Sequence, residues 1–125
     1  MTATLSLELP LDLRTPKAAR DAVAEHFGNE ARAGDLLLCV SEVVTNAVRH
    51  ARTQAHLTVF RKARRLTVEV RDGSQDLPIR RPISPVAVTG RGLRILDQLT
   101  TQWGTRATGS GKVVWFEFDL DELAS

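Results

Sequence analysis

The sequence predicts an α+β fold, a two-layer α/β sandwich whose mostly antiparallel sheet is covered on one face by helices. Helical and strand patterns occur in runs, in the order β-α-α-β-β-loop-α-β-β, rather than as alternating β-α-β units. The chain has 125 residues, which suffices for one core, so we expect residues 1–125 to form a single domain. Its composition, 42% hydrophobic and 26% charged, is typical of globular proteins rather than disordered ones.

The first half of the chain predicts one strand and two helices. Leucines alternate with polar residues over residues 5–9, which is the period of a strand. Thr15 as the N-cap and Pro16 at the first helical position open a helix that runs to about residue 27. A second helix begins between residues 31 and 35 and ends near residue 51, with apolar residues on one face.

The second half predicts a hairpin, a loop, a short helix and two final strands. Residues 56–60 and 66–71 alternate as strands, and the basic segment 61–65 between them is interpreted as a solvated hairpin tip. Residues 77–89 contain three prolines and no apolar period, which predicts a long loop of functional importance. The remaining elements are a helix over residues 93–99 and strands over residues 102–106 and 113–120.

Charge and cysteine content narrow the functional classes. The formal net charge is only +2, so the chain lacks the basic excess of a general nucleic-acid binder, and we expect no direct nucleic-acid contact. Cys39 is the one cysteine, which excludes an intrachain disulfide and predicts a buried thiol. No stretch of about 20 apolar residues and no signal-peptide pattern is present, so we expect a cytoplasmic protein without a membrane span.

Glu42 and Asn46 are the most informative polar pair. They lie one turn apart on the second predicted helix, so both can reach a single bound ligand. A carboxylate can act as a base, and an amide oxygen can ligate a hard cation such as Mg²⁺. The competing interpretation is that the pair belongs to the solvated face of an amphipathic helix.

Two further segments carry possible chemistry. Asp72 follows a predicted strand and precedes a glycine, which is typical of a turn but also places a carboxylate where it could accept a hydrogen bond from an exocyclic amine such as that of adenine. Gly90 and Gly92 precede a helix, where backbone N–H groups can approach a phosphate, although glycines also have simple geometric uses there.

Taken together and in this order, these segments resemble the GHKL ATPase superfamily, which includes the catalytic domains of histidine kinases. Residues 41–47 resemble its N-box, residues 72–74 its first glycine box, residues 90–93 its second, and residues 111–116 its terminal strand. The resemblance covers nearly the whole chain and implies the Bergerat ATP-binding fold, with ATP and Mg²⁺ as cofactors. The sequence departs from the usual pattern at Ser74 and Asp76, where glycines are common, and at residues 112–113, where a Gly-Thr pair is common.

Within that superfamily, the chain is most similar to the anti-sigma-factor serine/threonine kinases of actinobacterial type. The resemblance implies that Glu42 is the catalytic base, that Asn46 binds Mg²⁺ and that Asp72 binds the adenine amine. It implies an ATP lid over residues 77–89. The other nucleotide-binding residues that it implies are Ser74, Gly90, Arg91, Gly92 and Leu93.

The resemblance also implies partners. Similar proteins phosphorylate a STAS-domain anti-sigma antagonist, sequester an RNA polymerase sigma factor and are commonly homodimers. The alternative is a non-catalytic module that sequesters a partner and binds ATP weakly or as a structural ligand. A detached ATP domain of a histidine kinase is a third possibility, which is disfavoured because the sequence has no pair of phospho-acceptor helices.

Overall fold

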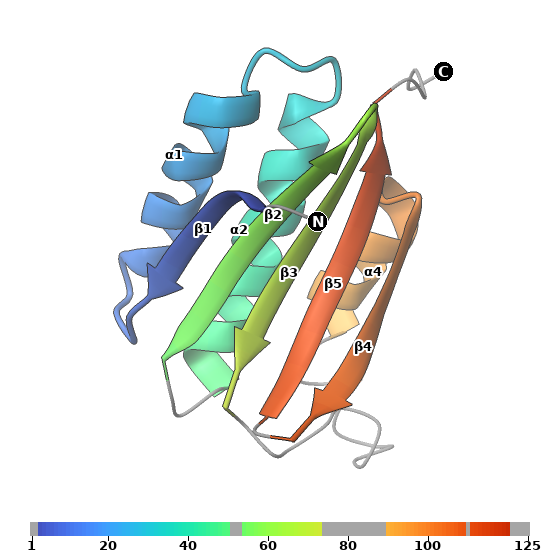
Figure 1. Cartoon of the computed structure of the whole chain (residues 1–125). Helices are drawn as coiled ribbons and strands as arrows, with labels where there is room; N and C mark the ends of the chain where they lie inside the picture. The colour runs from blue at the N-terminus through green and yellow to red at the C-terminus, as the bar shows by residue number, and fades with distance from the viewer. Residues whose placement is uncertain (1–2, 51–53, 74–89, 110, 121–125) are drawn as a thin grey trace.

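The computed structural model describes residues 3–50, 54–73, 90–109 and 111–120. Five strands of this part form one sheet in the order β1-β2-β3-β5-β4, and each neighbouring pair is antiparallel. Figure 1 shows the helices on one face of the sheet, which confirms the predicted α+β architecture. In chain order the elements are β1 (Ala3–Leu9), α1 (Thr15–Phe27), α2 (Ala33–His50), β2 (Ala55–Lys62), β3 (Arg65–Asp72), α4 (Gly90–Leu99), β4 (Gln102–Thr108) and β5 (Gly111–Asp119).

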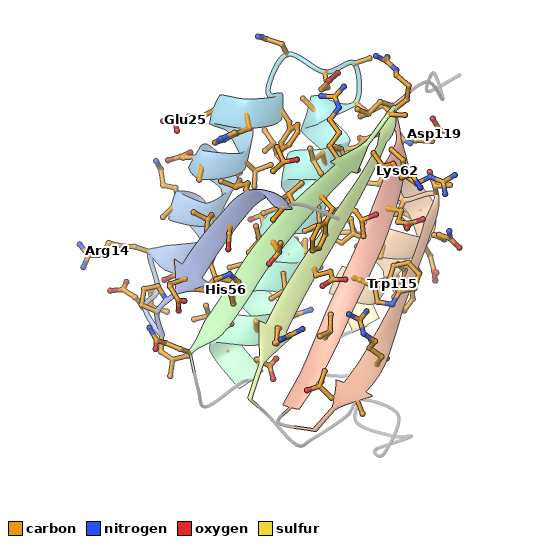
Figure 2. All side chains as sticks on the ribbon, in the orientation of Figure 1. Arg14, Glu25, His56, Lys62, Trp115 and Asp119 are labelled. Atoms are coloured by element: carbon orange, nitrogen blue, oxygen red, sulfur yellow. The ribbon has the colours of Figure 1, made fainter. Side chains whose placement is uncertain are left out.

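Strand alternation produces one apolar and one polar sheet face. In β2 and β3, every second side chain is buried, and these buried positions carry mainly β-branched residues and leucine, which suit a pleated sheet. His56 and Trp115 lie on the opposite face, which the helices leave uncovered (Figure 2). The helix-covered face forms the core together with inward residues of α1 and α2; its largest fully buried members include Leu36, Val40, Val44, Leu57, Val68, Phe116 and Phe118.

The basic segment between β2 and β3 is a hairpin tip, as predicted. Lys62 pairs with Arg65, which leaves only Ala63 and Arg64 in the turn. Ala63 has a φ of 55°, the positive value that tight hairpin turns require. Arg61 next to the turn forms an ion pair with Glu30 at 3.0 Å, so the hairpin tip lies beside the connection between α1 and α2.

The start of α1 differs by one residue from the prediction. The N-cap is Arg14 rather than Thr15, and no side chain caps the helix. Thr15 is instead the first helical residue, and its buried hydroxyl donates a hydrogen bond to the carbonyl oxygen of Pro10 at 2.7 Å. The prediction was wrong because the hydroxyl that would otherwise cap the helix bonds instead to the preceding loop, five residues earlier in the chain.

Arg32, just before α2, joins three elements of the core. Its Nη2 atom donates one hydrogen bond to the carbonyl oxygen of Leu99 at 2.6 Å and another to the Asp35 carboxylate at 3.1 Å. The guanidinium carbon lies 4.8 Å from the centre of the Phe118 ring, and the Arg32 side chain is only 11% exposed. These contacts hold the beginning of α2 against the end of α4. Since the two helices also pack against each other, the contact between the beginning of one and the end of the other makes them antiparallel.

Cys39 lies in the core, as predicted from its position in an apolar run. Its side chain is fully buried and the thiol is free. Burial, followed by the nearby Asp35 carboxylate, raises the pKa of the Cys39 thiol to about 12. The thiol therefore stays protonated at neutral pH and behaves as a small apolar core group. No helix in the described ranges has both the length and the apolar character needed to cross a bilayer.

Gly111 allows β5 to begin directly against the end of β3. A Cβ atom at this position would overlap the carbonyl oxygen of Asp72 and crowd the Cα atom of Gly73. Gly109, two residues earlier in the same turn region, has no atom within 4 Å of the corresponding Cβ position. Substituting alanine at each of the two glycines therefore distinguishes the effect of close packing at Gly111 from a general effect of losing a flexible residue.

We expect Gly111→Ala to lower the free energy of unfolding by about 1–3 kcal/mol, because the methyl group forces β3 and β5 apart. Gly109→Ala should change it by less than about 0.5 kcal/mol, because the added methyl group meets open space. Urea unfolding followed by circular dichroism measures both values. Equal effects of the two substitutions would show that the contact between Gly111 and Asp72 does not constrain the sheet.

Candidate active site

Glu42 and Asn46 lie in the C-terminal half of α2, with half-buried side chains. They are separated by one helical turn and therefore share a face of the helix. The residues between and beside them, including Val43, Val44 and Ala47, are buried, so this part of α2 is firmly packed. The structure thus places a carboxylate and an amide side by side on a rigid element, at the boundary between core and solvent.

Asp72 is the last residue of β3 and is only 5% exposed. It continues the series Leu66, Val68 and Val70, whose side chains are buried on the helix-covered face of the sheet. The pattern of β3 would therefore favour an apolar residue at position 72. A buried carboxylate at this position requires polar partners, because burial of an unpaired charge is costly. This departure from the apolar pattern distinguishes Asp72 from an ordinary turn residue.

The helix predicted over residues 93–99 begins earlier, at Gly90. The glycines at positions 90 and 92 are therefore within the first turn of α4 and do not precede it. Backbone N–H groups of a first turn have no partner within the helix and, together with the helix dipole, attract anions. The backbone of this turn is described, whereas the side chains of residues 90–93 lie outside the described part of the structure.

Chain topology brings these three segments to one end of the molecule. The contact of Arg32 with Leu99 places the end of α4 at the beginning of α2. The first turn of α4 therefore lies toward the C-terminal half of α2, which carries Glu42 and Asn46. Figure 1 shows that β3 ends at this same end of the molecule, and α2 packs on β3. Residues far apart in the sequence thus gather around the predicted site.

Lys112 is a residue that the sequence analysis did not select. It is paired with Asp72 across β3 and β5, and residues paired in this way point to the same face. Val113, the next residue, lies on the uncovered face with Trp115 because side chains alternate along the strand (Figure 2). The sequence departs from the family pattern at both residues 112 and 113. Of these two, only Lys112 therefore points to the same sheet face as Asp72. The sequence alone could not show which β5 residue lies on the side of Asp72, because that depends on the pairing register of the strands.

Several predicted residues cannot be placed. Ser74, Asp76 and the predicted ATP lid over residues 77–89 lie outside the described residues. In the part of the chain that the structure describes, no three His, Cys, Asp or Glu side chains form a metal-binding cluster. The donor set suits Mg²⁺ nonetheless, because this ion commonly takes one or two protein oxygens and completes its octahedron with phosphate and water. Asn46 would supply such a protein oxygen.

Comparisons with known proteins agree with this arrangement. The family model described as "Histidine kinase-like ATPase domain" matches residues 9–118. The fold is similar to that of the histidine kinase domain from Erythrobacter litoralis EL346 blue-light activated histidine kinase, with a TM-score of 0.54 and 23% sequence identity. That match covers 85% of this chain and 59% of the other chain, so the present chain spans only part of the relative's length. No curated protein sequence matches the chain.

The family match extends over most of the chain, from the end of β1 to the last residues of β5. It includes all the segments that form the candidate site. The structural likeness independently supports the GHKL fold that the motif order predicts. The chain therefore belongs to the histidine kinase-like ATPase domain family of the GHKL superfamily.

Proposed function

We propose that the chain binds ATP with Mg²⁺ between the C-terminal half of α2, the end of β3 and the first turn of α4. The observation that carries this proposal is the convergence of Glu42, Asn46 and the buried Asp72 at the same end as the α4 N-terminus, in a chain that matches the family over residues 9–118. Each group offers a different interaction: Asp72 accepts from the adenine amine, Asn46 ligates Mg²⁺, and the N–H groups of the first turn of α4 bind phosphate oxygens.

The reaction that we propose is transfer of the terminal phosphoryl group of ATP to a serine or threonine hydroxyl of a protein. Bound Mg²⁺ supplies charge neutralisation at the phosphates. The Glu42 carboxylate accepts the proton of the attacking hydroxyl as its oxygen bonds to phosphorus and the bond to the ADP oxygen breaks. Its half-buried position on a packed helix favours this role, because a base must be held in place and still be reached by the acceptor.

The substrate that we propose is a STAS-domain anti-sigma antagonist, and the second partner is an RNA polymerase sigma factor that the chain sequesters. This part of the proposal rests on the motif resemblance of residues 41–47, 72–74 and 90–93 to anti-sigma-factor kinases. Its competitor is sequestration without phosphoryl transfer. Both possibilities predict nucleotide binding, so transfer to a partner must be measured separately from binding.

The metal role of Asn46 is tested by titration calorimetry with ATP and with ADP. Binding to the native chain should require Mg²⁺, and Asn46→Ala should abolish the binding or its metal dependence, because the amide oxygen is lost. Asn29→Ala, in the exposed connection between α1 and α2, is the matched control and should bind like the native chain. Equal affinity of the native chain in EDTA and in Mg²⁺ would contradict the assignment.

The role of Asp72 is tested by comparing ATP with GTP. We expect ATP to bind more tightly, and Asp72→Asn to weaken ATP binding by about 1–3 kcal/mol, because a charge-assisted hydrogen bond to adenine is lost. Asp119→Asn, at the far end of β5, is a control that should leave affinity unchanged. Thermal unfolding of both variants shows whether the fold persists. If the native chain binds ATP and GTP equally, Asp72 does not select the base.

The catalytic role of Glu42 distinguishes a kinase from a sequestering module. Glu42→Gln keeps the size of the side chain and removes the base, so Mg-ATP affinity should persist while transfer falls by about 100-fold or more. The assay follows labelled phosphate on a STAS-domain partner. Glu69→Gln, whose native carboxylate pairs with Arg106 at 3.2 Å on β4, is the matched control.

Two results of that assay would revise the proposal in different ways. A native chain that binds ATP and partner yet transfers no phosphate would favour sequestration. A Glu42→Gln variant that transfers at the native rate would keep the kinase but assign the base to another residue.

A further inference from the structure

A serine, a histidine and a glutamate are joined by hydrogen bonds on the uncovered face of the sheet. The hydroxyl oxygen of Ser6 on β1 lies 2.6 Å from Nε2 of His56 on β2. The other ring nitrogen of His56, Nδ1, lies 3.2 Å from Oε1 of Glu8, which is also on β1. A neutral imidazole satisfies both bonds, because Nδ1–H donates to the carboxylate while Nε2 accepts the hydroxyl hydrogen.

The register of β1 and β2 brings the three side chains together. Glu8 is directly opposite His56, and Ser6 is opposite Thr58, two residues further along β2. Residues two apart on a strand point to the same face, so all three side chains lie on the face where Figure 2 shows His56. Glu8 therefore reaches the imidazole directly across the strands, and Ser6 reaches it along a diagonal. The partners are 50 and 48 residues apart in sequence, so only the paired sheet assembles them.

The pairing of the strands does not require these side-chain bonds. The backbones of β1 and β2 already pair without a shift over residues 5–9 and 55–59. The order hydroxyl, imidazole, carboxylate is instead the order that activates a nucleophile, because the imidazole takes the hydroxyl proton and the carboxylate holds the ring in the required tautomer. Both distances lie within the range of about 2.6–3.2 Å expected between a nucleophile, its base and the group that orients the base.

The three groups are accessible and adjoin an open hollow. Ser6 is exposed, and the side chains of Glu8 and His56 are 69% and 38% exposed. A hollow of about 440 Å³ lies beside Glu8 and His56, large enough for a small organic molecule. Arg71 also lines it, is exposed, and is paired with His56 across β2 and β3. Because paired residues share a face, Arg71 supplies a positive charge next to the imidazole.

We propose that Ser6, His56 and Glu8 form a hydrolytic site for small, activated carboxylic esters. The Ser6 oxygen bonds to the ester carbonyl carbon as its proton passes to Nε2 of His56. The bond from that carbon to the leaving oxygen then breaks, and this oxygen takes the proton from His56. Water adds to the acyl-serine with His56 again as the base, which releases the carboxylic acid and restores the Ser6 hydroxyl.

The remaining groups have supporting roles. Glu8 is a positioning residue, because it acts on the reaction through the orientation of His56. The Arg71 guanidinium stabilises the negative charge that forms on the carbonyl oxygen during attack. This site lies on the uncovered face of the sheet, whereas the side chain of Asp72 is buried on the helix-covered face. The proposal therefore does not rest on ATP binding or phosphoryl transfer, and it is tested without nucleotide.

Labelling with an alkyl fluorophosphonate tests the nucleophile. An activated serine oxygen bonds to the phosphorus of this reagent, fluoride leaves, and the base takes the hydroxyl proton. Mass spectrometry of the digested protein should find the label on Ser6 in the folded chain and not in the urea-unfolded chain, because unfolding separates Ser6 from His56. Ser6→Ala should abolish labelling, whereas Thr58→Val, which removes the neighbouring hydroxyl on the same face, should not. A folded native chain without label on Ser6, or equal labelling after unfolding, would overturn the proposal.

Hydrolysis of para-nitrophenyl acetate tests the base and its orientation. His56→Gln should lower kcat and the labelling rate of Ser6 by about 100-fold, whereas His26→Gln, on exposed α1 surface, should leave both unchanged.

Two variants of Glu8 distinguish positioning from simple stabilisation of β1. Glu8→Gln keeps an oxygen that accepts from Nδ1–H and should retain most of the labelling rate, whereas Glu8→Ala should lower it by about tenfold. Circular dichroism checks that each variant is folded. Native rates in His56→Gln or in Glu8→Ala would show that the three groups do not act together and would overturn the proposal.

Discussion

The buried guanidinium of Arg32 is the interaction on which the arrangement of the helices depends. It contacts the carbonyl oxygen of Leu99, the Asp35 carboxylate and the face of Phe118, and so connects both helices of the site to the sheet. An arginine can do this because its planar group donates several hydrogen bonds and still stacks on an aromatic ring. Hydrophobic burial alone would leave the helices free to shift along one another, whereas this contact fixes their ends.

The fixed ends have a functional consequence. Once the end of α4 is held at the beginning of α2, the first turn of α4 must lie toward the other end of α2, where Glu42 and Asn46 are found. Gly111 has a comparable role in the sheet, since its missing side chain lets β5 lie against the backbone of Asp72. The proposed nucleotide site is therefore positioned by contacts made at a distance from it as well as next to it.

Local sequence patterns determined the secondary-structure elements of this protein and pointed to its family. Period-two alternation and helical spacing predicted each strand and helix, and their order, because these patterns arise within a few neighbouring residues. The short motifs containing Glu42, Asn46 and Asp72 likewise pointed to the family that the comparisons support.

The tertiary structure decided what depends on contacts between distant segments. The insertion of β5 between β3 and β4 follows from long-range pairing, which no local pattern encodes. That pairing places Lys112 rather than Val113 on the side of Asp72. The burial of Arg32 arose in the same way, because only the packed fold brings Leu99 and Phe118 within its reach.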